Sequence, residues 1–351
     1  MIKLLNCPQI DEKSVLKFLQ LSKKEKQFSN FGICETLLCT SIAESLSVPV
    51  KQVCTGSNAT ALLFLACRML ADANGAKMGT GYFPAFSFFS TFSIASSLDH
   101  KKSWYDLDVN WNPCLQFDVS PRDFVFYSVP FGSPNIDRIL KFSESMDCPV
   151  IIDAAACLPG LLFHKIKLNS LPKNVIIVFS LHATKMLSAG EGALCVFGSA
   201  VPQHLKKLTN FGIAGGRQQS WTGSFNAKLS EFNAAAALSS LESFDARANE
   251  IMLAKRKAKK IGTPFGLQFF DDVDIPTLTL NIFHKKADDC LKTLESLGLE
   301  GRKWWSLQEN ATKVLYPNSF KFHSELLGLP FDWENIDEYF LDMCKTLALK
   351  S

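Results

Sequence analysis

The sequence has few charged residues and almost no net charge. Asp, Glu, Lys and Arg make up 20% of its 351 residues, and the formal net charge is +3. Proteins that coat nucleic acid need a strongly basic surface, because contacts to phosphate dominate their affinity. The composition therefore argues against a nucleic-acid-binding protein, and it is compatible with a local basic pocket for a phosphorylated substrate.

Long apolar runs and closely paired cysteines are also missing. No stretch reaches the roughly 18 uninterrupted apolar residues that a transmembrane helix requires, and the richest run, Tyr82 to Ser97, is broken by Pro84 and several serines. The first nine residues lack the apolar core of a secretory signal. The 11 cysteines form no C-x-x-C pair, so neither a disulfide framework nor a metal site is expected. We therefore expect a cytoplasmic protein without a membrane segment.

Apolar residues are nevertheless abundant, at 47% of the chain, which is enough for a large core. Short apolar runs alternate with stretches that are typical of helices, among them Ile136 to Met146. Because these runs are apolar on both faces, they predict a mostly parallel sheet in an α/β domain. The predicted strands are Asp123 to Val129, Pro149 to Ile152, Asn174 to Phe179 and Gly192 to Phe197.

The pattern changes in the last third of the chain. Ser230 to Ala254 are rich in alanine and leucine and predict one long helix. After it, polar helices alternate with short strands such as Thr277 to Phe283. We therefore place a boundary near residue 250, with a large domain over residues 1–250 and a smaller α+β domain over residues 251–351.

Three polar signals lie next to predicted strands and helices. Asp153 ends the run V-I-I-D, and Ser180 to Lys185 (S-L-H-A-T-K) directly follow the next strand. The loop Gly56 to Thr60 leads into an apolar helix, where free N–H groups and the helix dipole favour a phosphate. Ligands of open parallel sheets bind at the carboxyl ends of the strands. Taken singly, each signal also has an ordinary reading, such as a helix cap for Asp153 or a solvated charge for Lys185.

Together these signals match the requirements of pyridoxal phosphate. The cofactor needs a lysine that forms a Schiff base and a carboxylate that keeps the pyridine nitrogen protonated. It also needs hydrogen-bond donors for its phosphate and an aromatic or apolar surface over its ring. The residues that can meet these needs are Lys185, Asp153, the Asn58–Thr60 loop with Ser180, and the segment Pro84 to Phe88.

These motifs resemble those of the DegT/StrS sugar aminotransferases, which have the fold of aspartate aminotransferase (fold type I). The lysine motif F-S-L-H-A-T-K is followed by G-E-G-A, and the resemblance continues in the same order from about residue 50 to 245. The other similar segments are N-A-T-A-L-L-F-L-A at 58–66, P-A-F-S-F-F-S-T at 84–91, I-I-D-A-A-A at 151–156 and G-S-F-N-A-K-L-S-E at 223–231.

The resemblance implies a role for individual residues. Lys185 would carry the cofactor and then move the proton between the amine carbon and the cofactor, and Asp153 would pair with the pyridinium nitrogen. Asn226 would reach the phosphate of the neighbouring subunit's cofactor, which implies a homodimer with shared active sites. The other cofactor residues would be Asn58, Ala59, Thr60 and Ser180 at the phosphate and Phe88 on the ring.

Two features depart from the family pattern, and one agreement favours transamination. The phosphate loop reads Asn-Ala-Thr, where the family more commonly has Ser-Gly-Thr. The family usually has glutamine or histidine three residues after the aspartate, near the phenolic oxygen of the cofactor, but this chain has Ala156. Some of the family's dehydratases replace the lysine with histidine. Because Lys185 is present, transamination is favoured over deoxygenation, by a ping-pong reaction with L-glutamate as the amino donor.

The motifs D-A-A-A, S-L-H-A-T-K and R-K-W-W resemble transaminases that make dTDP-4-amino-4,6-dideoxy-D-glucose from dTDP-4-dehydro-6-deoxy-D-glucose for surface polysaccharides such as O antigen. Arg217 and Arg302 can pair with a diphosphate or a carboxylate, and Trp304 and Trp305 can stack on a base or a sugar. Surface charge and core packing are the alternatives for these residues. Two alternative functions remain open: amination of a 3-keto nucleotide sugar, and cofactor binding without turnover by a regulator.

Overall fold

The computed structural model of the protein describes residues 3–5, 7–8, 10–73, 79–115, 118–132, 136–199, 203–214, 216–218 and 223–350. Its largest element is an eight-stranded sheet. In spatial order the strands are β1 (Val53–Gly56), β9 (Ala193–Phe197), β8 (Val175–Ser180), β7 (Val150–Asp153), β6 (Phe124–Ser128), β2 (Thr80–Pro84), β4 (Lys101–Leu107) and β5 (Pro113–Cys114).

The centre of this sheet is parallel, as expected. Strands β8, β7, β6, β2 and β4 form four successive parallel pairs. Strand β9 is the exception, because it runs antiparallel to both β8 and β1. A parallel return usually requires a helical crossover, whereas residues 181–192 between β8 and β9 contain no helix. The mostly parallel α/β sheet is therefore confirmed, and the parallel direction expected for Gly192 to Phe197 is wrong.

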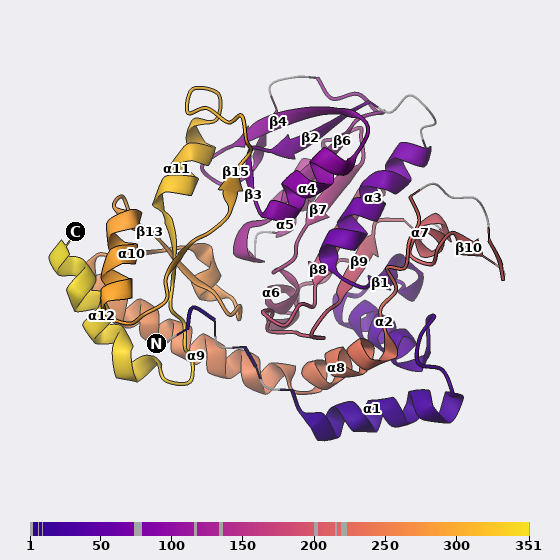
Figure 1. Ribbon diagram of the computed structural model, residues 1–351, viewed down its shortest axis with the longest axis horizontal. Coiled ribbons are helices and arrows are strands. Elements are labelled where there is room, and N and C mark those ends of the chain that lie inside the picture. The colour runs from indigo at the N-terminus through magenta and orange to yellow at the C-terminus, as the bar shows by residue number, and fades with distance from the viewer. Residues whose placement is uncertain are drawn as a thin grey trace.

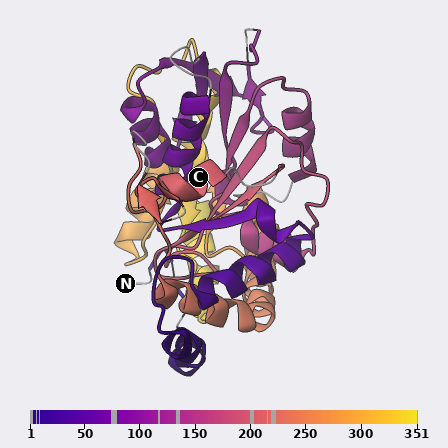
Figure 2. The same cartoon turned by 90° about the vertical axis from the view of Figure 1, so that its right-hand side faces the viewer.

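Helices cover both faces of the large sheet (Figures 1 and 2). Alternate side chains of one strand point to opposite faces, so Phe124 and Phe126 pack with helices α3, α4 and α7, whereas Val125 and Tyr127 pack with α2, α5 and α6. The helices before residue 210 are α1 (Glu12–Glu25), α2 (Ile33–Leu46), α3 (Ala59–Ala73), α4 (Phe89–Ser97), α5 (Ile136–Glu144), α6 (Leu158–Phe163) and α7 (Gln203–Leu208).

The C-terminal part of the chain builds a second sheet with strand order β12-β13-β16-β14. The remaining strands are β3 (Phe86–Ser87), β10 (Ile213–Ala214), β11 (Arg217–Gln218), β12 (Gln268–Phe269), β13 (Leu280–Phe283), β14 (Arg302–Lys303), β15 (Ser306–Leu307) and β16 (Leu326–Leu329). The remaining helices are α8 (Glu231–Glu242), α9 (Phe244–Gly262), α10 (Ala287–Ser296), α11 (Pro317–Glu325) and α12 (Ile336–Lys350). Strand β15 pairs with β3, so the C-terminal part is joined to the segment between β2 and α4.

The single long helix expected over Ser230 to Ala254 is wrong. Helices α8 and α9 follow one another along one side of the molecule (Figure 1), but they are separated at Ser243. The Ser243 hydroxyl lies 3.4 Å from the carbonyl oxygens of Ser239 and Ser240, and such side-chain bonds compete with the helical ladder. The boundary expected near residue 250 falls inside α9 and stays a prediction. In the part of the chain that the structure describes, no helix combines the length and apolar character of a membrane span.

Candidate active site

A cavity of about 840 Å³ lies at the carboxyl ends of strands β7 and β8. Its walls come from segments far apart in the sequence, including the start of α3, the connection after β8, the stretch Thr277–Thr279 and the stretch 302–305. The structure brings nine of the eleven predicted site residues to this cavity. They are Asn58, Ala59, Thr60, Phe88, Asp153, Ser180, Lys185, Arg302 and Trp304.

Asp153 supplies a buried carboxylate at the end of β7. Its side chain is 7% exposed, and its Oδ1 accepts a hydrogen bond of 3.1 Å from the Ala155 N–H. Burial raises the pKa of Asp153 to about 6, although the Ala155 N–H and the Lys185 ammonium oppose this shift. A carboxylate in such a setting gains most from a nearby cation, because a positive partner offsets its desolvation. Asp153 therefore suits a protonated ring nitrogen.

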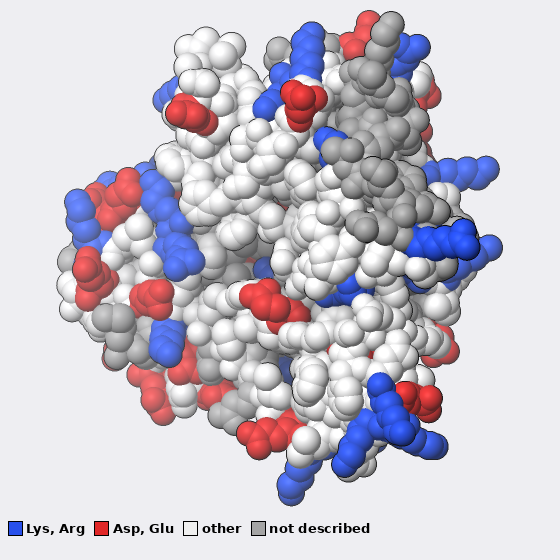
Figure 3. Space-filling view, turned by 45° about the vertical axis from the view of Figure 1, so that its right-hand side comes forward, with Lys and Arg blue, Asp and Glu red and all other residues white. Residues whose placement is uncertain are grey.

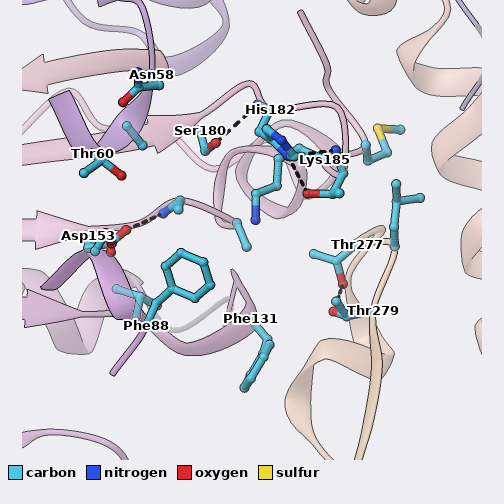
Figure 4. A pocket seen from close by; sticks show the side chains of 18 of the residues that line it. Asn58, Thr60, Phe88, Phe131, Asp153, Ser180, His182, Lys185, Thr277 and Thr279 are labelled. Carbon is cyan, nitrogen blue, oxygen red and sulfur yellow. Dashed lines mark hydrogen bonds between the residues drawn. The ribbon is translucent and has the colours of Figure 1, made fainter. Parts of the chain in front are cut away.

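Lys185 extends into the middle of the cavity from the connection after β8 (Figure 4). Its backbone N–H donates to the His182 carbonyl over 2.8 Å, which fixes the turn that carries it. Burial lowers the pKa of Lys185, and the Asp153 carboxylate opposes the shift. Among the described residues, none forms a hydrogen bond with its Nζ. A lowered pKa leaves a larger fraction of the amine neutral, which suits both a nucleophile and a base.

The start of α3 and Ser180 form an anion site. The Asn58 Oδ1 accepts a 2.8 Å bond from the Ala61 N–H and so caps the helix. In the described structure, the N–H groups of Ala59 and Thr60 donate to no protein acceptor, and such free groups at a helix start bind phosphate. The Ser180 Oγ accepts from the His182 N–H over 3.2 Å, so its own proton stays available to a ligand. These groups fit the phosphate of the expected cofactor.

Phe88 lies at the N-terminal end of α4 and is 49% exposed, with its ring at the cavity (Figure 4). Its carbonyl accepts from the Thr91 N–H over 3.0 Å, which starts the helix. The hydroxyl of Ser87 bonds to those of Thr91 and Ser128 over 2.8 and 2.7 Å, all three being buried. This buried hydroxyl cluster holds the segment that presents the Phe88 ring to the cavity, where a planar cofactor can stack.

Two predicted residues lie outside this cavity. Asn226 is exposed and pairs with Asn210 in an isolated antiparallel bridge. Arg217 is exposed on the short strand β11. Neither residue lines the cavity that contains Lys185.

The R-K-W-W segment contributes to the far wall of the cavity. The Arg302 guanidinium lies 5.4 Å from the centre of the Trp304 ring, within the range of a cation–π contact. The Trp304 Nε1 is buried, has no hydrogen-bond partner among the described residues and faces β16, where a Cβ on Gly328 would come within 2.1 Å of it. Only a glycine at position 328 leaves room for this indole. Trp305 stacks on Phe131, with ring centres 5.2 Å apart.

Sequence reasoning missed several residues that line the cavity. They are chiefly Phe131, Glu191 and the stretch Thr277–Thr279. One signal for the threonines was available: T-L-T-L-N at 277–281 alternates polar and apolar residues, which indicates one polar face. His182 received no catalytic role. Its Nδ1 accepts from the Thr184 N–H over 3.2 Å, and its Nε2 lies 3.5 Å from Glu191 at the cavity edge.

Comparisons with known proteins match most of the chain to aminotransferases. The model of the DegT/DnrJ/EryC1/StrS aminotransferase family matches residues 9–259. The chain is 26% identical to Protein Rv3402c of Mycobacterium tuberculosis over 336 residues, which cover 90% of this chain and 79% of that protein. It is also 26% identical to the dTDP-4-amino-4,6-dideoxy-D-glucose transaminase of Shigella dysenteriae over 321 residues, or 86% and 83% of the two chains.

Solved structures of aminotransferases share the fold. The aminotransferase TlmJ from Streptoalloteichus hindustanus superimposes with a TM-score of 0.81 at 17% identity and full coverage of both chains. DesI, crystallised with its TDP-sugar product, superimposes with a TM-score of 0.76 at 22% identity, covering 98% of this chain and 91% of that one. At these identities the likeness establishes the architecture alone.

Proposed function

Because this chain belongs to the DegT/DnrJ/EryC1/StrS aminotransferase family, whose enzymes have fold type I and depend on pyridoxal phosphate, we propose that it moves an amino group from L-glutamate to a nucleotide-linked keto-sugar. One observation carries this proposal: the Lys185 amine, the Asp153 carboxylate and the open start of α3 line one cavity, in which Asp153 and the α3 start lie on the side facing Lys185. The specific acceptor that we propose is dTDP-4-dehydro-6-deoxy-D-glucose, and the product is dTDP-4-amino-4,6-dideoxy-D-glucose. The name of the Shigella relative supports this choice.

The chain's own residues would hold the cofactor at three points. Asp153 would face the ring nitrogen, Phe88 would cover one face of the ring, and the N–H groups of Ala59 and Thr60 with the Ser180 hydroxyl would bind the phosphate. When bound, pyridoxal phosphate supplies an electron sink for the charge that develops as an amine carbon loses its proton.

Lys185 would attach the cofactor and carry the proton. Burial lowers the pKa of its ammonium group, so the neutral amine forms at a lower pH than in water. In the glutamate half-reaction the neutral Nζ would take the proton from the amine carbon and pass it to the cofactor, and in the second half-reaction it would carry a proton from the cofactor to the corresponding carbon of the sugar. The same nitrogen would serve in both halves of a ping-pong reaction because it lies in the cavity close enough to the Asp153 carboxylate to interact with it electrostatically.

A homodimer would complete the site. Several large apolar side chains are exposed, and Figure 3 shows that uncharged side chains cover most of the middle of one face. Exposed aromatic residues are enriched at protein interfaces. Asn226 of one copy would then reach the phosphate in the other, and Arg217 would add a positive charge for the substrate's diphosphate. In the described part of the chain, the exposed aromatic residues that lie away from α4 are Phe28, Phe211, Phe225 and Phe232.

The test is to incubate purified protein with pyridoxal phosphate, L-glutamate and a panel of 4-keto and 3-keto nucleotide sugars. We expect the 4-keto dTDP-sugar to be aminated fastest, and mass spectrometry with NMR identifies the carbon that carries the nitrogen. Preferential amination at C3 would show that the acceptor is a 3-keto nucleotide sugar instead of the 4-keto sugar. Cofactor absorbance near ~410–420 nm that glutamate leaves unchanged would indicate a binding protein without turnover.

A further inference from the structure

One wall of the cavity is built from a segment that carries no family motif. Thr277, Leu278 and Thr279 line the cavity immediately before strand β13. Figure 4 shows Thr277 and Thr279 across the cavity from Asn58, Thr60 and Asp153, with Lys185 between the two sides. The two threonine hydroxyl oxygens lie 3.3 Å apart. This position lies on the side of the cavity opposite the expected phosphate site.

A fully buried lysine stands behind this wall. Lys255, in the middle of α9, has 0% exposure, and its Nζ donates to the Asp272 carbonyl and, over 2.8 Å, to the Thr277 hydroxyl. The Nζ also lies 5.5 Å from the centre of the Phe331 ring. Burial lowers the pKa of Lys255 to about 8, and the carboxylates of Asp272 and Asp274 oppose the shift. Asp274 is itself paired at the surface with Lys259.

Asp272 holds the other threonine. Its side chain is 0% exposed, and its Oδ2 accepts from the Thr279 hydroxyl over 2.7 Å and from the Asn281 amide over 2.8 Å. Its Oδ1 accepts from the Asn281 N–H over 3.2 Å. Burial raises the pKa of Asp272 to about 6, and Lys255 opposes the shift. Burying two charged groups stabilises a fold weakly or not at all. We therefore infer that Lys255 and Asp272 serve to hold the two threonine side chains in place.

The same segment is seated against the part of the chain that carries the cofactor site. Ile275 packs on two glycines of that part. A Cβ on Gly160 would lie 3.2 Å from the Ile275 Cγ2, and one on Gly132 would lie 3.1 Å from its Cδ1. The wall is therefore fixed from both sides, by Ile275 at the front and by Lys255 and Asp272 behind.

The hydrogen bonds that Thr277 and Thr279 already make determine which donor and acceptor remain available to a ligand. A lysine ammonium only donates, so the Thr277 oxygen accepts from Lys255 and keeps its own proton. The single Thr279 proton is shared between the Asp272 carboxylate at 2.7 Å and the Thr277 oxygen at 3.3 Å, with the shorter, charged partner dominant, so the Thr279 oxygen keeps lone pairs. A donor and an acceptor thus lie 3.3 Å apart on one wall. A sugar hydroxyl, which both donates and accepts, is complementary to this pair.

We propose that Thr277 and Thr279 bind a hydroxyl group of the acceptor sugar, and that Lys255 and Asp272 are the positioning residues that hold them for it. This inference rests on the proposed function, since it names a contact for the keto-sugar. It assigns no part to the wall in holding the cofactor.

The experiment compares the two half-reactions, each followed by the cofactor's absorbance, in wild type, Lys255→Met, Thr277→Val and the double variant. We expect the KM for the keto-sugar to rise about tenfold in each single variant, as loss of one well-placed hydrogen bond does. The double variant should be little worse than either single variant, because both remove the same contact. The glutamate half-reaction should stay within about twofold of wild type. Lys257→Met, which changes an exposed lysine of the same helix, is the control.

Equal losses in both half-reactions, or fully additive effects on the KM, would overturn the positioning role. If Lys255→Met fails to fold, Thr277→Val decides the matter, and Thr277→Ser should restore the KM because it keeps the hydroxyl. A wild-type protein that aminates keto-sugars while Thr277→Val leaves the KM unchanged would contradict this inference alone. A wild-type protein that aminates no keto-sugar would contradict the proposed function, and this inference with it.

Discussion

The two sides of the cavity hold their polar groups in different ways. On the cofactor side, Asp153 and Ser180 end strands β7 and β8, and the free N–H groups belong to the first turn of α3. Backbone geometry alone puts these groups at one edge of the sheet. On the opposite side, Thr277 and Thr279 depend on Lys255 and Asp272, which are buried behind them. Side chains that are distant in the sequence therefore determine the substrate side.

This difference predicts separable consequences. Changes on the cofactor side should affect both half-reactions and the affinity for pyridoxal phosphate. Changes on the opposite side should leave cofactor binding intact and alter the handling of the keto-sugar. The following substitutions test that separation.

The largest effect is expected from Lys185→Ala. Removing the amine removes both the attachment point and the proton carrier, so turnover should fall by about four orders of magnitude or more. Stopped-flow absorbance with glutamate and with keto-sugar measures both half-reactions, and both should be lost. Lys292→Ala changes an exposed lysine paired with Asp289 and should leave both rates unchanged. Retention of either half-reaction in Lys185→Ala would break the comparison.

Asp153→Asn should lower turnover by about 100-fold or more. The substitution removes the fixed negative charge that would face the cofactor's ring nitrogen and stabilise the charge distribution of the transition state. It also tests pH dependence. Since the pKa of Asp153 in the cofactor-free protein is about 6, the carboxylate becomes protonated as pH falls from 7.5 to 5, and cofactor affinity should drop over that range. The cofactor phosphate also titrates near pH ~6, but in both proteins alike. Fluorescence titration should therefore show a steeper pH dependence in wild type than in Asp153→Asn, and equal slopes would contradict the assignment.

Gly328→Ala tests the opposite side. A Cβ there would come within 2.1 Å of the Trp304 Nε1, so the indole must move, and overpacking of this kind costs about 1–3 kcal/mol. We expect the KM for the keto-sugar to rise about tenfold while the dissociation constant of the cofactor stays unchanged. Adding Trp304→Phe removes the clashing edge and should restore part of the loss. Weakened cofactor binding in Gly328→Ala would show that the two sides are coupled.

The smallest effect is expected from Phe88→Ala. Loss of one aromatic face should weaken cofactor binding about three- to tenfold, in line with ~0.5–1.5 kcal/mol for an aromatic contact. Phe89→Ala is a matched control, because Phe89 is the next residue, is 61% exposed and does not line the cavity. Equal effects of the two substitutions on the equilibrium titration would argue against stacking by Phe88.

The sequence by itself determined three of the central parallel strands, β6, β7 and β8, and the residues at the carboxyl ends of the last two. Asp153, Ser180 and Lys185 could be assigned to one site because strand ends of a parallel sheet share one edge. The start of α3 followed from its Asn58 cap for a similarly local reason. In each case a few neighbouring residues specify the backbone that presents the group.

Only the tertiary structure revealed the cavity wall at Thr277–Thr279, the antiparallel direction of strand β9 and the separation of helices α8 and α9 at Ser243. Nothing local to Thr277 shows that Lys255, one helix earlier, donates to its hydroxyl, and no pattern around Gly328 shows that an indole edge packs on it. Contacts of this kind depend on how α9 and the second sheet pack against the large domain. Long-range packing is a property of the whole chain, so short sequence motifs carry no record of it.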